Sequence, residues 1–198
     1  MKIFRKEDLA TPPADEGWNT VEFGFSLTEA RIISYLSLAI FFGINGTGFY
    51  WMGDTYLNDI RWVADEHPVF RFFLVALAVA AYYAAHESIH AAFFPNKGRG
   101  PDTKIGIMSF AVFVLYNNRI GRNRFMWVSL APALIFLPFI AVPLIVSPGF
   151  FALNLIGLHF TACLGDFMLF NTLRSLPRNA EIWTTGSSAW TRHFAALQ

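Results

Sequence analysis

Two histidines and a glutamate lie within five residues of one another in the stretch AYYAAHESIHAAFF, at positions 81–94. The rest of this stretch is small, aliphatic or aromatic, which suits a helix surrounded by lipid. An ionisable side chain at membrane depth costs about 3 kcal/mol or more, so it is normally kept only where it faces a protein interior or a watery cavity. His86, Glu87 and His90 therefore indicate a site with a chemical role.

The spacing of the two histidines allows them to bind one metal ion. Residues four apart lie on one face of a helix, so His86 and His90 can direct their imidazoles to the same point. HESIH also fits the pattern H-E-x-x-H, in which the histidines bind zinc and the glutamate takes a proton from water. Zinc lowers the pKa of its water to about 7 and so makes a nucleophile for a carbonyl. The predicted chemistry is amide hydrolysis, with Glu87 as general base and later proton donor.

A purely structural explanation of the same residues is that His86 and His90 hydrogen-bond neighbouring helices and that the short pattern is accidental. The membrane setting weighs against it, because a buried Glu87 without a chemical role would be costly. Small residues also make this helix thin enough for the close helix approach that a shared metal site needs. They are Ala78, Ala80, Ala81, Ala84, Ala85, Ala91 and Ala92.

A catalytic zinc site commonly has three protein ligands, so HESIH needs a partner. Asp166 is the only carboxylate in the apolar run NLIGLHFTACLGDFMLFN, and it is expected at about the same membrane depth as His86. His159 shares the helix face of Asp166 about 10 Å away, which favours a packing or supporting role. Cys163 is the alternative donor within one turn of Asp166. Tyr82 and Tyr83, one turn before His86, could donate to an oxyanion or simply pack.

The composition predicts an all-α polytopic membrane protein. Of 198 residues, 55% are hydrophobic and only 15% are charged, with a mean hydropathy of +0.41, which is too apolar for a soluble domain of this size. The net charge of +1 gives no reason to expect a nucleic-acid partner. The single cysteine excludes an internal disulfide and a cysteine-based zinc cluster.

Four apolar runs are long enough to span a bilayer as helices. They are Ile32–Met52, Val69–Phe94, Phe125–Val146 and Phe150–Leu173. The segment KIGIMSFAVFVLYNN at 104–118 is shorter and rich in β-forming residues, so we predict a strand or re-entrant hairpin between spans two and three. Its edge could receive an unwound substrate as an added strand, and a proline at Phe110 or Val112 would then remove a backbone donor.

Basic residues in the connections predict the orientation, because they are retained on the cytoplasmic side of a membrane. The connection between Met52 and Val69 is acidic, whereas the one between spans two and three is basic and both ends of the chain carry basic residues. Both termini should therefore be cytoplasmic. This divides the chain into a cytoplasmic amino-terminal segment at 1–31, a four-helix membrane domain at 32–173 and a cytoplasmic tail at 174–198.

The stretch from Val69 to Leu173 resembles membrane zincins of the site-2 protease class. It is most similar to a family of small bacterial membrane proteins described as zincin peptidases. The resemblance rests on HESIH, on LAP at Leu130–Pro132 and on GD at Gly165–Asp166. In site-2 proteases the aspartate ligand is followed by glycine, whereas here the glycine precedes it. The resemblance implies a zinc-binding core of spans two to four in the bacterial inner membrane, with Ile32–Met52 as an added helix.

We therefore predict a zinc metallopeptidase of the membrane, with Zn²⁺ held by His86, His90 and Asp166 and with Glu87 as the catalytic residue. Its expected partners are the lipid bilayer and membrane or membrane-proximal polypeptides as substrates. One alternative is a zinc-binding membrane adaptor without proteolytic activity. A membrane desaturase is a further alternative, but five histidines are too few for the histidine clusters of that family. The substrate, the pathway and the oligomeric state leave no signal in the sequence.

Overall fold

The computed structural model describes residues 2–3, 10–14, 17–21, 27–65, 67–108, 111–185 and 189–193. The chain divides into two compact units. The first unit consists of Met1–Gly24, Ala84–Pro132 and Asp166–Gln198, and the second of Phe25–Tyr83 and Ala133–Gly165. Phe110, which the sequence suggested as a site for a test substitution, lies outside the described residues.

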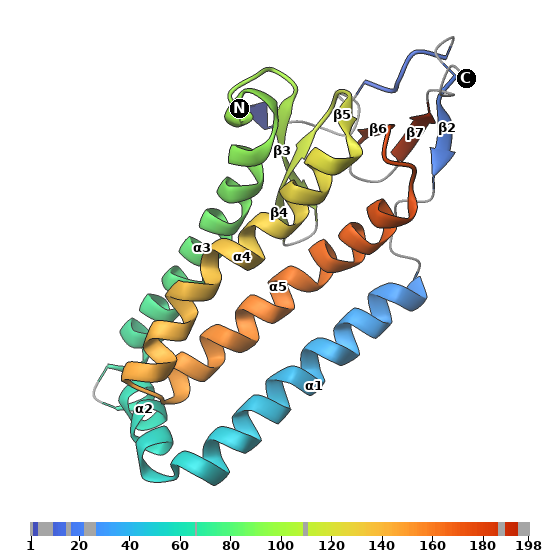
Figure 1. The fold of residues 1–198 in the computed structure, drawn as a ribbon. Coiled ribbons are helices and arrows are strands. Elements are labelled where there is room, and N and C mark those ends of the chain that lie inside the picture. The colour runs from blue at the N-terminus through green and yellow to red at the C-terminus, as the bar shows by residue number, and fades with distance from the viewer. Residues whose placement is uncertain are drawn as a thin grey trace. The chain divides into compact units, whose positions relative to one another are not determined.

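Four long helices dominate the described chain (Figure 1). They are α1 (Leu27–Met52), α3 (Pro68–Phe93), α4 (Arg122–Val146) and α5 (Phe150–Ser175). Each contains a stretch long and apolar enough to cross a membrane, with a mean hydropathy between 1.5 in α1 and α5 and 2.4 in α4. The four predicted spans and the mainly helical fold of a membrane protein are therefore confirmed, with ends that differ by a few residues from the predicted ones.

A short helix, α2 (Asp54–Ala64), fills most of the connection between the first two spans. From the sequence, this connection was expected only to be an acidic loop. The turn from α1 into α2 is made at Gly53, whose positive φ of 47° is a conformation that side chains with a Cβ rarely adopt. Tyr56 on α2 is buried, and its hydroxyl donates to Asn45 Oδ1 of α1.

Close packing and amides join α1 to α5 within the second unit. A Cβ on Gly48 of α1 would lie 2.6 Å from Leu153 Cδ1 of α5, so a larger residue here would require the Leu153 side chain to move. Nearby, Asn45 Nδ2 donates to Asn154 Oδ1 of α5 over 3.2 Å. Paired amides satisfy each other where water is excluded, which is why such residues serve as polar contacts between membrane helices.

A β-hairpin follows α3 in the first unit. After the short 3₁₀ turn η3 (Pro95–Gly98) come β3 (Thr103–Met108) and β4 (Ala111–Tyr116), which pair antiparallel with Ile105 opposite Val114. The strand β1 (Lys2–Ile3) pairs parallel to β3, so the order is β1-β3-β4. Figure 1 shows this hairpin beside the end of α3. The predicted β-like segment between spans two and three is confirmed as a hairpin.

A second sheet of four strands lies in the same unit, in the order β2-β7-β6-β5. Its strands are β2 (Asn19–Val21), β5 (Ile120–Gly121), β6 (Ala180–Thr184) and β7 (Ala189–His193). Three of these strands fall in the segments 1–31 and 174–198, for which the sequence analysis predicted no strand. These three strands are three to five residues long and are too short to stand out as an alternating pattern.

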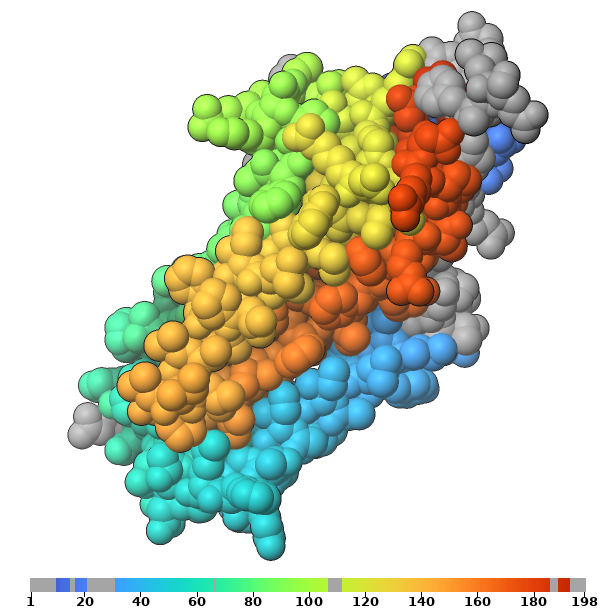
Figure 2. Space-filling view, in the orientation of Figure 1, coloured from blue at the N-terminus to red at the C-terminus, as the bar shows by residue number. Residues whose placement is uncertain are grey.

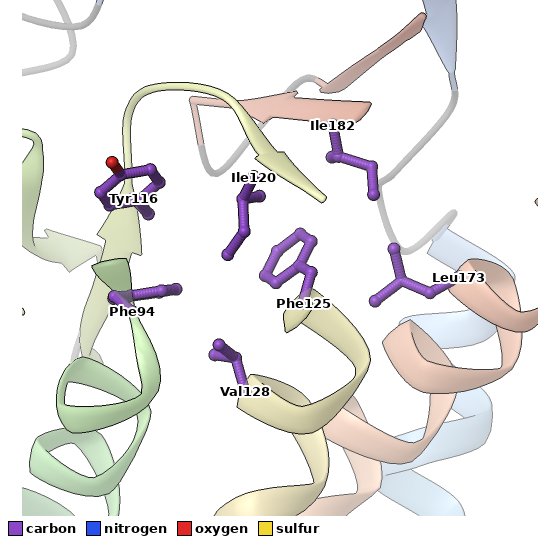
Figure 3. Close-up of a cluster of buried hydrophobic side chains, with 7 residues drawn as sticks. All are labelled: Phe94, Tyr116, Ile120, Phe125, Val128, Leu173 and Ile182. Atoms are coloured by element: carbon purple, nitrogen blue, oxygen red, sulfur yellow. The ribbon is translucent and has the colours of Figure 1, made fainter. Parts of the chain in front are cut away.

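The core of the first unit is a cluster of buried apolar side chains between the helix ends and the two sheets (Figure 3). It contains Phe94, Tyr116, Ile120, Phe125, Val128, Leu173 and Ile182. In Figure 2 the yellow and the red parts of the chain, which are far apart in the sequence, lie side by side on the surface. The cluster therefore fixes the ends of α3 and α5 and the start of α4 against one another.

Candidate metal centre

Four ionisable side chains meet in the first unit, on the last turns of α3 and on α5. His86, Glu87 and His90 belong to α3, and Asp166 belongs to α5. His86 is 3% exposed and His90 is 7% exposed, and the side chain of Asp166 is 15% exposed. The structure thus brings together all four residues that the sequence analysis selected, in a place that is nearly closed to solvent.

Three side chains with ligand-type atoms, those of His86, His90 and Asp166, form a small triangle. His86 Nε2 lies 3.1 Å from Asp166 Oδ2, and His90 Nε2 lies 3.2 Å from Asp166 Oδ1. The two Nε2 atoms are 3.2 Å apart. Two ligand atoms bound at about 2.0–2.1 Å to a tetrahedral zinc ion are about 3.3 Å apart, so the triangle has nearly the size that one zinc ion requires. Two imidazoles and one carboxylate are also a donor set found in catalytic zinc sites.

A backbone carbonyl of α4 fixes the tautomer of His90. His90 Nδ1 lies 2.8 Å from the carbonyl oxygen of Val128. A carbonyl only accepts hydrogen bonds, so Nδ1 must carry the proton and donate. In the neutral ring this leaves the lone pair of Nε2 directed at the triangle, which is the arrangement that supporting contacts impose on metal-binding histidines. This contact could not be predicted from the sequence, because Val128 contributes only its backbone.

Glu87 lies beside the triangle and is held by the hairpin. Its carboxylate has an oxygen within 4.8 Å of a ring nitrogen of each histidine. Oε2 accepts a hydrogen bond of 2.8 Å from the backbone N–H of Val114 in β4. A carboxylate that is fixed next to two metal-binding groups can take up a proton at that point and release it again. The contact with β4 was not predicted, although the sequence analysis had placed a β-like segment next to the helices.

His159 is in contact with both Cys163 and Tyr82 in the second unit. His159 Nε2 donates to the carbonyl oxygen of Ala133 over 3.3 Å, so its Nδ1 accepts from the hydroxyl of Tyr82 over 2.8 Å. Both ring nitrogens thus have protein partners, which fits the predicted packing or supporting role. Cys163 is 1% exposed with its sulfur 3.8 Å from His159 Nδ1, and it stays the alternative donor on the face of Asp166.

The two tyrosines before His86 differ in their surroundings. The hydroxyl of Tyr82 is used in the hydrogen bond to His159, and its ring packs against Phe136 with centroids 4.9 Å apart. Tyr83 is 40% exposed. For Tyr82 this geometry favours packing, which was one of the two roles that the sequence left open.

The site thus combines an H-E-x-x-H pattern on one helix with an aspartate from a second helix, a set of groups able to bind a metal ion. The chain belongs to the family described as "Putative zincin peptidase", whose model matches residues 79–180, just over half of the chain. The match covers all four residues of the site. No curated protein and no solved structure matches the chain. The family suggests a metallopeptidase and implies zinc as its metal.

Proposed function

We propose that this protein is a membrane-embedded zinc metallopeptidase that hydrolyses peptide bonds of membrane or membrane-proximal proteins. The observation that carries the proposal is the triangle of His86, His90 and Asp166, with the carboxylate of Glu87 beside it. A direct test is cleavage of model transmembrane peptides by the purified protein, with and without a zinc chelator. Cleavage that depends on the metal would support the proposal.

In this mechanism His86, His90 and Asp166 hold the metal, and a bound zinc ion would supply a Lewis acid that polarises the substrate carbonyl and acidifies water. Glu87 accepts the proton of the attacking water and passes it to the leaving amine. The hydrogen bond from Val114 keeps the Glu87 carboxylate in place during this transfer. Burial of the two histidines keeps bulk water away from the reacting groups.

The hairpin offers a binding place for an extended substrate. The backbone N–H groups along β4 point alternately toward β3 and away from it. The N–H of Val114 points away from β3 and donates to Glu87. The N–H of Asn117, just after β4, points the other way and donates to the carbonyl oxygen of Asp102, just before β3. Val112, two residues before Val114, therefore directs its N–H to the outer side of β4. Among the described residues no strand pairs with this side of β4. A substrate strand added there would run past Glu87, and its amide bonds would be exposed for cleavage.

A proline at Val112 tests this role of β4. We expect Val112→Pro to leave the β3–β4 ladder intact, because the missing N–H points outward, and to slow cleavage of extended substrates by about 10-fold, the equivalent of one lost hydrogen bond of about 1.4 kcal/mol. Val112→Ala, which keeps the N–H, is the matched control. Cleavage rates of a peptide series measure the effect, and equal rates for both variants and the wild type would argue against strand addition.

We also propose the orientation and surroundings of the enzyme. The basic connections support an orientation in which both termini and the first unit's sheets lie in the cytoplasm of a bacterial cell and the chain spans the inner membrane four times. The metal centre then lies in the cytoplasmic half of the bilayer, within about two turns of the end of α3 and two to three turns of the end of α5. Polypeptide substrates would reach it from that half.

The second candidate function is a zinc-binding membrane adaptor without proteolytic activity. The contact between Glu87 and Val114 favours it, because an oxygen of the proposed base is already occupied by the protein's own backbone. The two functions differ in hydrolysis and agree in zinc binding. A purified protein that binds zinc but cleaves no model substrate would favour the adaptor.

A further inference from the structure

Two arginines at the start of α4 bind the ends of two other helices. Arg122 donates from Nε to the carbonyl oxygen of Leu173 and from Nη2 to that of Arg174, each over 2.8 Å. Arg124 donates from Nε to the carbonyl oxygen of Phe93 over 3.1 Å and from Nη2 to that of Phe94 over 2.8 Å. Each guanidinium therefore spans two successive carbonyls, one pair at the end of α5 and the other at the end of α3.

These carbonyls lie at helix ends, where the regular hydrogen bonds within the helix stop. Two of them also accept from the backbone, that of Leu173 from the N–H of Leu176 and that of Phe94 from the N–H of Lys97, each over 3.1 Å. The last four C=O groups of a helix have no intrahelical donor, and together they carry a partial negative charge of about half an electron. An arginine can both donate to these carbonyls and balance the negative charge of the helix end, because its planar guanidinium group donates several hydrogen bonds and stays positively charged. Arg122 is only 9% exposed, so its two hydrogen bonds to α5 are formed largely out of water, where they are stronger.

The two helices that these arginines bind are the ones that carry the metal centre. Phe93 is three residues after His90 on α3, and Leu173 is seven residues after Asp166 on α5. One turn after Arg124, the carbonyl oxygen of Val128 accepts from His90 Nδ1. The first two turns of α4 thus contact the end of α3, the end of α5 and one of the histidines.

We propose that Arg122 and Arg124 are positioning residues that set the register of α3 against α5 and so bring Asp166 to within ligand distance of His86 and His90. This inference rests on the proposed zinc site. Because a helix is stiff over one or two turns, a shift at its end moves the ligand by a similar amount. The triangle edges of 3.1–3.2 Å leave little room for such a shift.

Ordinary helix capping would give the same hydrogen bonds but a different response to mutation. Capping alone would lower stability and leave the affinity of the folded protein for zinc unchanged. Positioning also changes the affinity and the coordination geometry. The absorption spectrum of the cobalt-substituted protein reports that geometry without any need for hydrolysis.

The test compares Arg124→Gln and Arg124→Lys with Arg178→Gln, which removes an exposed arginine beyond the end of α5. Zinc affinity is measured by chelator competition, cobalt spectra are recorded, and circular dichroism checks the fold. We expect Arg124→Gln to lower zinc affinity by about 10- to 100-fold, which is the usual effect of removing a group that orients a metal ligand. The same variant should also shift the cobalt spectrum. Arg124→Lys keeps the positive charge but loses the planar guanidinium. This variant should retain the fold and show a smaller loss of zinc affinity than Arg124→Gln.

The result for the control separates the possible outcomes. Arg178→Gln should match the wild type in affinity and spectrum. If the wild type binds zinc and the folded Arg124 variants show the same zinc affinity and cobalt spectrum, the positioning role is wrong. The proposed function would still stand in that case. A wild type that binds neither zinc nor cobalt would overturn both.

Discussion

Glu87→Gln should keep its zinc and lose peptide hydrolysis by about 100-fold or more, the usual size of a general acid–base contribution. The amide of glutamine cannot take a proton from water, so the proposed proton transfer fails. Glutamine has nearly the same size and keeps a carbonyl oxygen, which can still accept the hydrogen bond from the N–H of Val114. The metal ligands are unchanged, and for this reason zinc content should stay at the wild-type level.

The control for this substitution is Glu181→Gln. Glu181 lies on β6 in the same unit, where it accepts from Arg192 over 2.6 Å and has no place in the proposed site. The Glu181→Gln variant should hydrolyse a model membrane substrate at the wild-type rate. If Glu87→Gln also cleaved at that rate, the peptidase hypothesis would be wrong. If the wild-type protein binds zinc but hydrolyses no substrate, the result would instead favour a zinc-binding membrane adaptor.

Asp166→Ala should lose zinc almost completely. The carboxylate supplies both oxygens of the triangle, one 3.1 Å from His86 and the other 3.2 Å from His90, and alanine supplies neither. Losing a ligand should reduce affinity by well over the roughly 10- to 100-fold that a supporting group costs. The measurement is zinc content of the purified variant in the presence of a competing chelator.

Two further variants identify the third ligand. Cys163→Ala should keep its zinc, and His159→Ala should show at most an intermediate loss, because His159 is tied to Tyr82 and Ala133. Stoichiometric zinc in Asp166→Ala would remove Asp166 from the site. Loss of zinc in Cys163→Ala, with retention in Asp166→Ala, would instead make the cysteine the ligand.

Much of the fold could be predicted because the bilayer imposes a simple requirement on the sequence. A spanning helix needs about 20 apolar residues, and runs of that length are visible in any hydropathy pattern. The helix α2 and the strands β5, β6 and β7 carry no such signal. They are short, and their pairing, such as Ile120 opposite Ile182, depends on contacts between residues far apart in the chain.

The residues of the candidate site were predictable for a related reason. His86, Glu87, His90 and Asp166 are expensive to keep in membrane helices, so their presence alone indicates a function. The groups that support them were not predictable. Val114 and Val128 act through backbone atoms, which any residue could supply, and Arg122 and Arg124 resemble the other basic residues of a cytoplasmic connection.

The most direct test of the account is the zinc content of the purified wild-type chain after equilibration with a competing chelator. The triangle of His86, His90 and Asp166 predicts about one zinc ion per chain, and none in a variant in which both histidines are replaced by alanine. A wild-type protein that retains no zinc, or a double variant that retains as much as the wild type, would contradict the account.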